Sequence, residues 1–282
     1  MQIIKSIQEA RDIIGQVKLK AKRIGFVPTM GALHQGHISL MEKSVCECDF
    51  TVVSIFVNPI QFVAGEDFEK YPRDILKDAK MVESAGVDLL FVPEAVEILG
   101  NNLLTYIDIE KLGDNLCGAK RPGHFRGVCT IVAKFFNIIN PDSAYFGKKD
   151  IQQLHIIKKM TEDLNFDIKI IPCSIVREED GLAMSSRNAY LSDEERSDAV
   201  VINQSLKEAI GLIDKGETSS NVIIKMIEKK ISKIGYAKID YVKIVNKDME
   251  DVEKIEKGDI IACAVFFGGA RLIDNHIVGE KL

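Results

Sequence analysis

Two histidines stand three residues apart near the start of the chain, in the segment VPTMGALHQGH at residues 27–37. The segment follows an apolar run typical of a buried strand and leads into a helix. At this spacing His34 and His37 can face one cavity and donate hydrogen bonds to a phosphate oxygen. Gly31 and Gly36 allow tight turns and a close approach of the backbone to a ligand. The structural alternative is that both imidazoles only cap the helix or pack.

A second group of polar residues lies in YFGKKDIQQL, residues 145–154, where another apolar run ends and another helix begins. Lys149 offers a point positive charge to a triphosphate. Asp150 is placed to cap the helix, and Gln153 lies one turn further along, directed at the same cleft. A solvated Lys-Lys-Asp turn is the competing interpretation.

Two other segments add neutral and cationic donors. FVNPIQF, residues 56–62, carries Asn58 and Gln61, whose amides suit hydroxyl and carboxylate groups, although Asn-Pro is also an ordinary turn opener. MSSRN, residues 184–188, holds two hydroxyls and the Arg187 guanidinium, which can donate hydrogen bonds to phosphate oxygens. Polar loops of this kind are also common without any function.

Alternating patterns between residues 23 and 176 predict a Rossmann-like doubly wound α/β domain with a parallel sheet. The expected strands are RIGFVPTM, FTVVSIFVNP, VDLLFVP, SAYFG and DIKIIPCSIV. Runs such as TVVSIFV are apolar on both faces, which suits a sheet covered by helices on each side. The expected helices cover residues 37–48, 74–85, 127–139 and 150–164, and the opening residues MQIIKSIQEARDII also have helical spacing. We assign residues 1–176 to this domain.

The pattern changes after Val176. REEDGLAMSSRNAYLS is expected to form a long loop, followed by helices at about residues 193–215 and 219–234 and by strands at 237–246, 259–267 and 270–278. Gly268-Gly269 joins the last two strands and indicates a tight hairpin. Residues 177–282 are therefore expected to form a smaller C-terminal α+β domain, which we interpret as a lid with a hinge near residue 176.

The composition favours chemistry on small molecules. The chain has 282 residues, and 46% of them are hydrophobic, which is enough to bury a core. A formal net charge of −5 gives no electrostatic reason to expect a nucleic-acid partner. The six cysteines have no metal-binding spacing and mostly apolar neighbours, so we expect buried free thiols in a reducing, cytoplasmic setting and no metal site formed by the protein alone. No signal peptide or membrane-spanning segment is expected.

The segment PTMGALHQGH resembles the His-x-Gly-His signature of class I aminoacyl-tRNA synthetases and nucleotidylyltransferases. Its longer form resembles the pantothenate synthetase family in particular. MSSRN resembles a shortened form of the mobile Lys-Met-Ser-Lys-Ser loop of the synthetases. The resemblance runs essentially from end to end, through EDFEKYPRD, RPGHFRGVCTIV, IDYVKIV and ARLIDN, and it places RPGHFRGVCTIV on the pantoate side of the cleft.

The resemblance implies roles for individual residues. The implied catalytic set is His34, His37, Lys149 and Arg187, with His37 as the acid at the phosphates. Gln61 is expected to bind pantoate and β-alanine, Gln153 to bind pantoate, and Asn58 to assist. Val176 is placed against the adenine. The implied ATP-binding set is Met30, Gly31, Ala32, Leu33, His34, Gln35, Gly36, His37, Gly147, Lys148, Lys149, Asp150, Val176, Met184, Ser185, Ser186 and Arg187.

The implied reaction joins pantoate to β-alanine in two steps. The pantoate carboxylate attacks the α-phosphorus of ATP and releases pyrophosphate, and the amine of β-alanine then displaces AMP. ATP with Mg²⁺ is the implied co-substrate, the partners are small molecules, and the family association implies a homodimer. Two alternatives stay open: a nucleotidylyltransferase that acts on another vitamin precursor, and an ATP-binding module without catalysis. Gln61 and Gln153 argue against the first, because a phosphate acceptor would call for more cations in its pocket.

Overall fold

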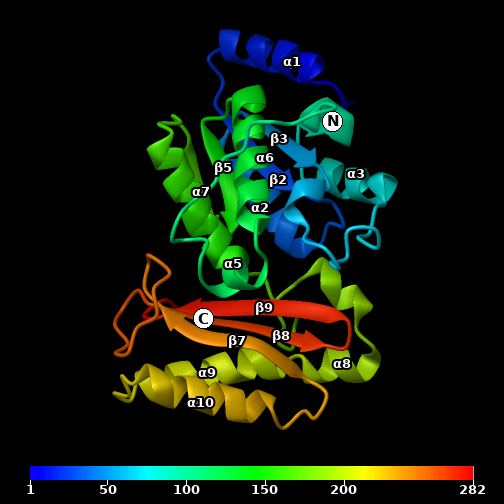
Figure 1. Cartoon of the computed structure of the whole chain (residues 1–282). Helices are drawn as coiled ribbons and strands as arrows, with labels where there is room; N and C mark the ends of the chain where they lie inside the picture. Colours follow the sequence, from blue (N-terminus) through cyan, green and yellow to red (C-terminus); the bar gives the residue numbers. More distant parts are fainter. Residues whose placement is uncertain (282) are drawn as a thin grey trace.

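A computed structural model describes residues 1–281 of the chain (Figure 1). Its larger part is a six-stranded parallel sheet with the strand order β1-β4-β3-β2-β5-β6. The strands are β1 (Gln2–Ile4), β2 (Ile24–Thr29), β3 (Phe50–Ile55), β4 (Leu89–Phe91), β5 (Ser143–Gly147) and β6 (Lys169–Cys173). The predicted Rossmann-like doubly wound sheet is confirmed, and it contains every strand expected between residues 23 and 176.

Both faces of this sheet are buried. Successive side chains of a strand point to opposite faces, so neighbouring residues belong to different apolar cores. Phe26 belongs to one apolar core and its neighbour Val27 to the other. Val52 and Val53 repeat this alternation in the adjacent strand. The first core is closed by α1 (Ile7–Leu19), α6 (His124–Ile139) and α7 (Ile151–Asp163), and the second by α2 (Gln35–Glu47) and α3 (Ile75–Ser84); α4 (Ala95–Leu99) and α5 (Leu116–Lys120) are short.

The first strand was not expected from the sequence. The opening residues have helical spacing, yet β1 pairs with β4 before the helix begins, with Ile3 opposite Leu90. Ser6 then starts α1 with a capping box, in which Ser6 and Glu9 satisfy each other's backbone N–H groups. Three residues are too few to show a strand period, and their partner lies more than 80 positions away.

The strand order creates a crevice at the carboxyl edge of the sheet. β2 lies between β3 and β5, so the chain moves outward on one side of β2 and later returns to its other side. Loops that leave neighbouring strands at such a reversal diverge and leave space for a ligand. The loop after β2 carries the two histidines, and the turn after β5 carries Lys149. The topology therefore brings the two strongest predicted segments to one place.

The C-terminal part is a three-stranded antiparallel sheet with helices on its outer side (Figure 1). Its strands are β7 (Lys238–Val245), β8 (Ile260–Phe267) and β9 (Ala270–Ile277), and its helices are α8 (Asp193–Asp198), α9 (Val201–Ile213) and α10 (Ser220–Ile231). The hairpin at Gly268-Gly269 is present, with Gly268 at a φ of +53°. One helix was expected over residues 193–215; the structure has two, α8 and α9, separated at Ala199 and Val200, which keep right-handed helical dihedrals.

The two parts are packed together along a continuous seam. Val245, Ile260 and Ala262 of the C-terminal part lie in the same apolar core as α6 and α7. Asn275 of β9 is buried, and its side-chain amide donates hydrogen bonds of 2.9 Å to the carbonyl oxygens of both Lys148 and Lys149. The small sheet is thus attached directly to the turn that carries Lys149.

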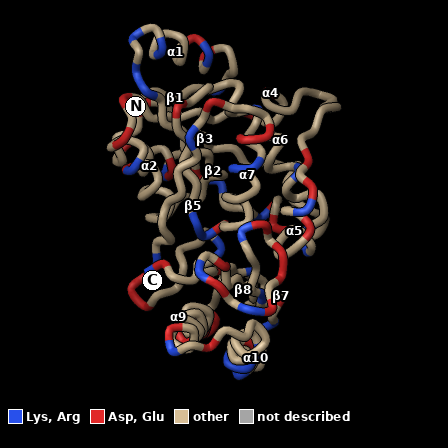
Figure 2. Tube along the Cα trace, turned by 90° about the vertical axis from the view of Figure 1, so that its left-hand side faces the viewer, with Lys and Arg blue, Asp and Glu red and all other residues tan. Residues whose placement is uncertain are grey.

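No helix within residues 1–281 has the length and apolar character needed to cross a membrane. Lys and Arg positions are interspersed with Asp and Glu positions along the trace (Figure 2). The chain shows no long run of one sign of charge in that view, in line with its formal net charge of −5.

Helix α6 packs closely against the 3₁₀ turn η1 (Pro59–Gln61) at Gly127, so a larger side chain there should destabilise the fold. A Cβ atom on Gly127 would lie 2.2 Å from the carbonyl oxygen of Ile60. Gly127→Ala must push the turn away from α6, and we expect it to lower the free energy of unfolding by about 1–3 kcal/mol. Urea denaturation measures this change.

Gly211→Ala in α9 is the matched control, because no atom lies within 4 Å of the added Cβ. We expect this change to raise the free energy of unfolding by about 0.5–1 kcal/mol, as alanine favours a helix interior over glycine. Equal unfolding curves for the two variants would contradict the packing argument.

Candidate functional site

A cavity of about 810 Å³ lies between the two parts of the chain. Lys149, Asp150, Gln153, Ser185 and Arg187, all predicted from the sequence, line it. Ser185 and Arg187 belong to the loop after β6, and the antiparallel sheet of the C-terminal part adds to the lining. Its lining residues include Asp240, Tyr241, Arg271, Asp274 and Asn275.

The loop after β2 is held in shape by a buried carboxylate. Asp78 of α3 accepts hydrogen bonds of 2.9 Å from the backbone N–H groups of Ala32 and Leu33. Gly31 has a φ of +81°, and a Cβ atom there would lie 2.9 Å from the Asp78 carboxylate. Asp78 was not predicted, because no motif marks a carboxylate that binds a loop more than 40 residues earlier in the chain.

The same loop fixes the tautomers of both histidines. His34 is the N-cap of α2, and its Nδ1 accepts from the N–H of Gly36 at 3.1 Å. His37 lies in the first turn, as predicted, and its Nδ1 accepts from the N–H of His34 at 3.3 Å. A neutral imidazole that accepts at Nδ1 carries its proton on Nε2. Each ring therefore keeps one N–H donor for a ligand.

Both histidines are neutral near pH 7. Burial, together with the positive charge of Lys149, lowers the pKa of His34 to about 4. Burial, followed by the neighbouring His34 and by Lys149, lowers the pKa of His37 to about 3. The two rings are tilted by 45° to one another with their centroids 4.1 Å apart, so a second charge beside the first would be unfavourable.

The MSSRN segment reaches the same place. A Cβ atom on Gly36 would lie 3.9 Å from the Cβ of Met184, so this segment touches the loop that follows β2. Val176 is paired to it, because the N–H of Met184 donates to the Val176 carbonyl at 3.0 Å. The segment begins the 3₁₀ turn η3 (Ser186–Tyr190), whose N-cap is Ser185.

Asn58 and Gln61 are used differently from one another. Asn58 is buried, and its side-chain amide donates to the Gln61 side chain at 2.9 Å and to the Gly127 carbonyl at 3.1 Å. The Gln61 amide nitrogen in turn contacts the Met30 sulfur at 2.7 Å. Asn58 therefore holds Gln61 in place within the protein, and Gln61 joins the two loops that follow β2 and β3.

Three predicted residues have surroundings that the sequence did not indicate. Lys148 is paired with Glu280 at 2.6 Å, so its charge is already compensated. Asp150 occupies the N-cap position of α7, but the prediction that its side chain caps the helix is wrong, since it makes no such hydrogen bond. The helix after β5, α7, begins through the 3₁₀ turn η2 (Lys148–Asp150) instead of through a side-chain cap. Gln35 is exposed at the start of α2.

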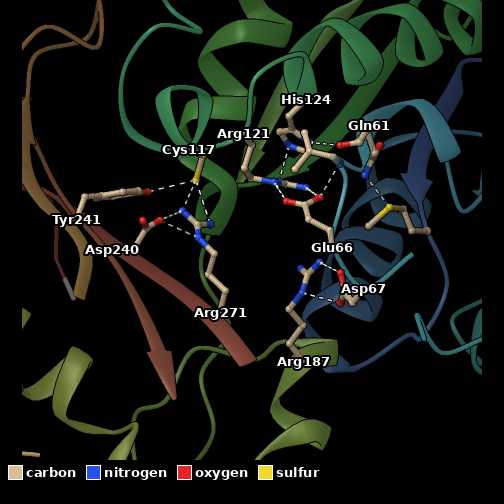
Figure 3. Close-up of polar contacts among 12 residues, drawn as sticks. Gln61, Glu66, Asp67, Cys117, Arg121, His124, Arg187, Asp240, Tyr241 and Arg271 are labelled. Carbon is tan, nitrogen blue, oxygen red and sulfur yellow. Dashed lines mark hydrogen bonds and ion pairs between the residues drawn. The ribbon is translucent and has the colours of Figure 1, made fainter. Parts of the chain in front are cut away.

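A polar network missed by the sequence analysis lines the cavity beside Gln61 (Figure 3). Nδ1 of His124 contacts the Gln61 carbonyl oxygen at 2.7 Å, and the Arg121 guanidinium lies 2.9 Å from the other ring nitrogen. Arg121 also forms a bidentate ion pair with Glu66. Burial, with the Arg121 charge, lowers the pKa of His124 to about 4. Only the matching stretch RPGHFRGVCTIV hinted at this network.

Two more arginines face the cavity in carboxylate pairs (Figure 3). Arg187 binds Asp67, with Nε and Nη2 at 3.0 and 2.9 Å from the carboxylate oxygens. Arg271 binds Asp240 at 3.0 and 2.7 Å, beside Cys117 and Tyr241. Cys117 is a free cysteine, as are the other five. Four of the six are buried as expected, but Cys46 is exposed and Cys48 is half-buried, which corrects the expectation that all are buried.

Comparison with known proteins agrees with this geometry. The family profile described as "Pantoate-beta-alanine ligase" matches residues 2–277. The pantothenate synthetase of Clostridium botulinum (strain Okra / Type B1) is 52% identical over 276 residues, 98% of each chain. That of Caldicellulosiruptor bescii is 50% identical over 282 residues, the full length of both chains.

Solved structures give the same result. A crystal structure of pantothenate synthetase from Thermus thermophilus has a TM-score of 0.94 at 39% identity, covering 99% of this chain and 100% of the other. The pantoate-beta-alanine ligase of Francisella tularensis, complexed with beta-gamma ATP and beta-alanine, has a TM-score of 0.82 at 34% identity over 100% and 99% of the two chains. The resemblance that the motifs indicated is confirmed, and the chain belongs to the pantoate-beta-alanine ligase family.

Proposed function

We propose that this chain condenses pantoate with β-alanine at the expense of ATP, through a pantoyl-adenylate intermediate. Membership of the family supports the overall reaction. The observation that carries it to this molecule is topological: the loop with His34 and His37 follows β2, and the turn with Lys149 follows the adjacent strand β5 at the reversal point of the sheet. Lys149, Gln153 and Arg187 line one cavity there. These groups can neutralise and orient a triphosphate next to a small carboxylate.

The first step places an anion against a polyanion, so positive charge and oriented donors matter more than a nucleophilic side chain. In our proposal Lys149 and Arg187 supply the charge. His34 and His37 supply neutral Nε2–H donors at the phosphates, because their Nδ1 atoms are occupied by backbone N–H groups. His37 thus acts as a hydrogen-bond donor and not as an imidazolium acid.

The remaining predicted residues complete the two binding sites in this proposal. Gln61 and Gln153 bind pantoate, Gln61 also contacts β-alanine, and Asn58 acts through Gln61. ATP lies along the segments 30–37, 147–150 and 184–187, with its adenine near Val176.

Mg²⁺ would enter with ATP. Residues 1–281 contain no group of three or more His, Cys, Asp or Glu side chains arranged to hold a metal ion. Asp150 is the one acidic side chain in the predicted ATP-binding set, and it lines the cavity. One carboxylate with phosphate oxygens and waters is a usual environment for Mg²⁺, which would offset charge on the phosphates.

The acyl adenylate needs protection from water until the amine arrives. We propose that residues 177–282 serve as a lid on residues 1–176, since the cavity lies between them. We further propose that the protein works as a homodimer in the cytoplasm. Sedimentation equilibrium tests the dimer directly.

The experiment that tests the reaction is product analysis by mass spectrometry. The purified chain is incubated with ATP, Mg²⁺ and pantoate, with and without β-alanine. We expect AMP and pantothenate only in the complete mixture. Without β-alanine we expect pyrophosphate and enzyme-bound pantoyl adenylate, together with pantoate-dependent exchange of pyrophosphate into ATP. Formation of an adenylylated product that β-alanine does not consume would support the nucleotidylyltransferase alternative.

Removal of the charge or of the donor at the phosphates should slow adenylation. Lys149→Ala and His37→Ala are each expected to lower the rate of pantoate-dependent ATP–pyrophosphate exchange by roughly 10²- to 10⁴-fold, while the protein stays folded. Exchange kinetics measure the loss, and circular dichroism checks the fold. Near-normal exchange in both variants would remove these residues from the mechanism.

The two half-reactions should differ in their dependence on pH. His34 and His37, with pKa values of about 4 and about 3, stay neutral from pH 5.5 to 9, so neither should give the exchange reaction a titration step in that range. β-Alanine must attack as the free amine, whose fraction rises roughly tenfold per pH unit below an amine pKa of roughly 10. We expect amide formation to accelerate with pH while exchange stays level, as single-turnover assays would measure. A step near pH 6.5 in exchange that His37→Ala abolishes would show that His37 acts as a cation.

A further inference from the structure

We propose that Asp67 is a positioning residue: it binds one edge of the Arg187 guanidinium and thereby presents the opposite edge to the phosphates of ATP. The inference rests on the proposed function, because it assigns the preparation of Arg187 for that reaction. Neither the MSSRN motif nor the family resemblance attaches a role to Asp67. The argument depends on which of the arginine's donors are already bound.

One edge of the Arg187 guanidinium is already hydrogen-bonded within the protein. Its Nε and Nη2 donate to the two oxygens of Asp67 at 3.0 and 2.9 Å, which is a side-on bidentate pair. Within residues 1–281 no other protein atom accepts a hydrogen bond from this guanidinium. The edge formed by Nη1 and the second proton of Nη2 is therefore available, and it matches two oxygens of a phosphate group.

The other two arginines of the cavity have protein partners at both edges of the guanidinium (Figure 3). Arg121 is side-on to Glu66, and its Nη1 meets His124 at 2.9 Å. Arg271 is bound to Asp240, and its Nη1 and Nη2 lie 3.6 and 3.7 Å from the Cys117 sulfur. Arg187 is thus the cavity arginine with an edge left for an anion, within the part of the chain that the structure describes.

Asp67 belongs to a segment that covers the MSSRN loop. The Tyr71 hydroxyl lies 3.4 Å from Oγ of Ser186, and the Tyr190 hydroxyl donates to the Lys70 carbonyl at 3.4 Å. Both side chains of the Arg187–Asp67 pair are only about a quarter exposed, at 27% and 22%. The pair is therefore partly shielded from water, which strengthens the hold of Asp67 on the Arg187 side chain. It joins two loops that are 120 residues apart in sequence.

A competing role for Asp67 makes the opposite kinetic prediction. If the carboxylate blocked the site as a substitute for phosphate, its removal would free Arg187, lower the KM for ATP and leave kcat unchanged or higher. If it positions Arg187, its removal leaves the positive charge in place but lets the side chain change rotamer. In that case kcat falls, while the KM for ATP changes little.

The test is a double-mutant cycle with Asp67→Asn, Arg187→Ala and the double variant, read by pantoate-dependent ATP–pyrophosphate exchange. We expect Asp67→Asn to lower kcat by about 10- to 100-fold with a change in KM for ATP of less than about threefold. In the Arg187→Ala background the same change should alter kcat by less than about twofold, because Asp67 acts through Arg187. Melting temperatures of all variants exclude a loss caused by unfolding.

Asp180→Asn is the matched control, because it removes a carboxylate from the Arg196 pair, which lies outside the cavity lining. Its exchange kinetics should equal those of the wild type. Additive losses in the cycle, or a lower KM with kcat retained in Asp67→Asn, would overturn the inference. Absence of pantoate-dependent exchange in the wild type would instead refute the proposed function, and the inference with it.

Discussion

The position of β2 between β3 and β5 is the constraint on which the site depends. Because the sheet reverses its winding there, the loops that follow these strands separate and leave room at the carboxyl edge. Two different helix starts, at His34 and after Lys149, then converge on one place. A helix start offers free N–H groups and a partial positive charge, both suited to phosphate. The sheet thus supplies the location, and the side chains only complete it.

The electrostatics of the site follow from how its groups are held. Burial, with the charge of Lys149 as a lesser cause, lowers the pKa of both histidines well below 7, and each Nδ1 accepts a backbone N–H. Positive charge must then come from side chains that remain ionised when buried. Arginine does so, and each cavity arginine is paired with a carboxylate. The proposed phosphate site would in this way hold positive charge without an imidazolium.

Local sequence was sufficient for the features that depend on near neighbours. The buried strands, the Gly268-Gly269 hairpin and the histidine loop each leave a signal within about ten residues, and each was predicted. The features that were missed depend on distant partners. β1 needs β4, the histidine loop needs Asp78, and Arg187 needs Asp67. No periodicity or spacing in one sequence encodes such pairs, because an acidic residue on a loop is ordinarily a solvated one.

Asn275 connects these observations to the proposed lid. Its amide donates to the carbonyl oxygens of Lys148 and Lys149, so the small sheet and the turn that carries Lys149 form one hydrogen-bonded unit. Arg177, directly after the proposed hinge, is tied in turn to Asp274, the residue that precedes Asn275. A rotation of residues 177–282 away from the large sheet would have to break these contacts or displace Lys149. If ATP binds at Lys149 as proposed, its binding should favour the closed arrangement, because the same backbone turn would contact both the nucleotide and the proposed lid.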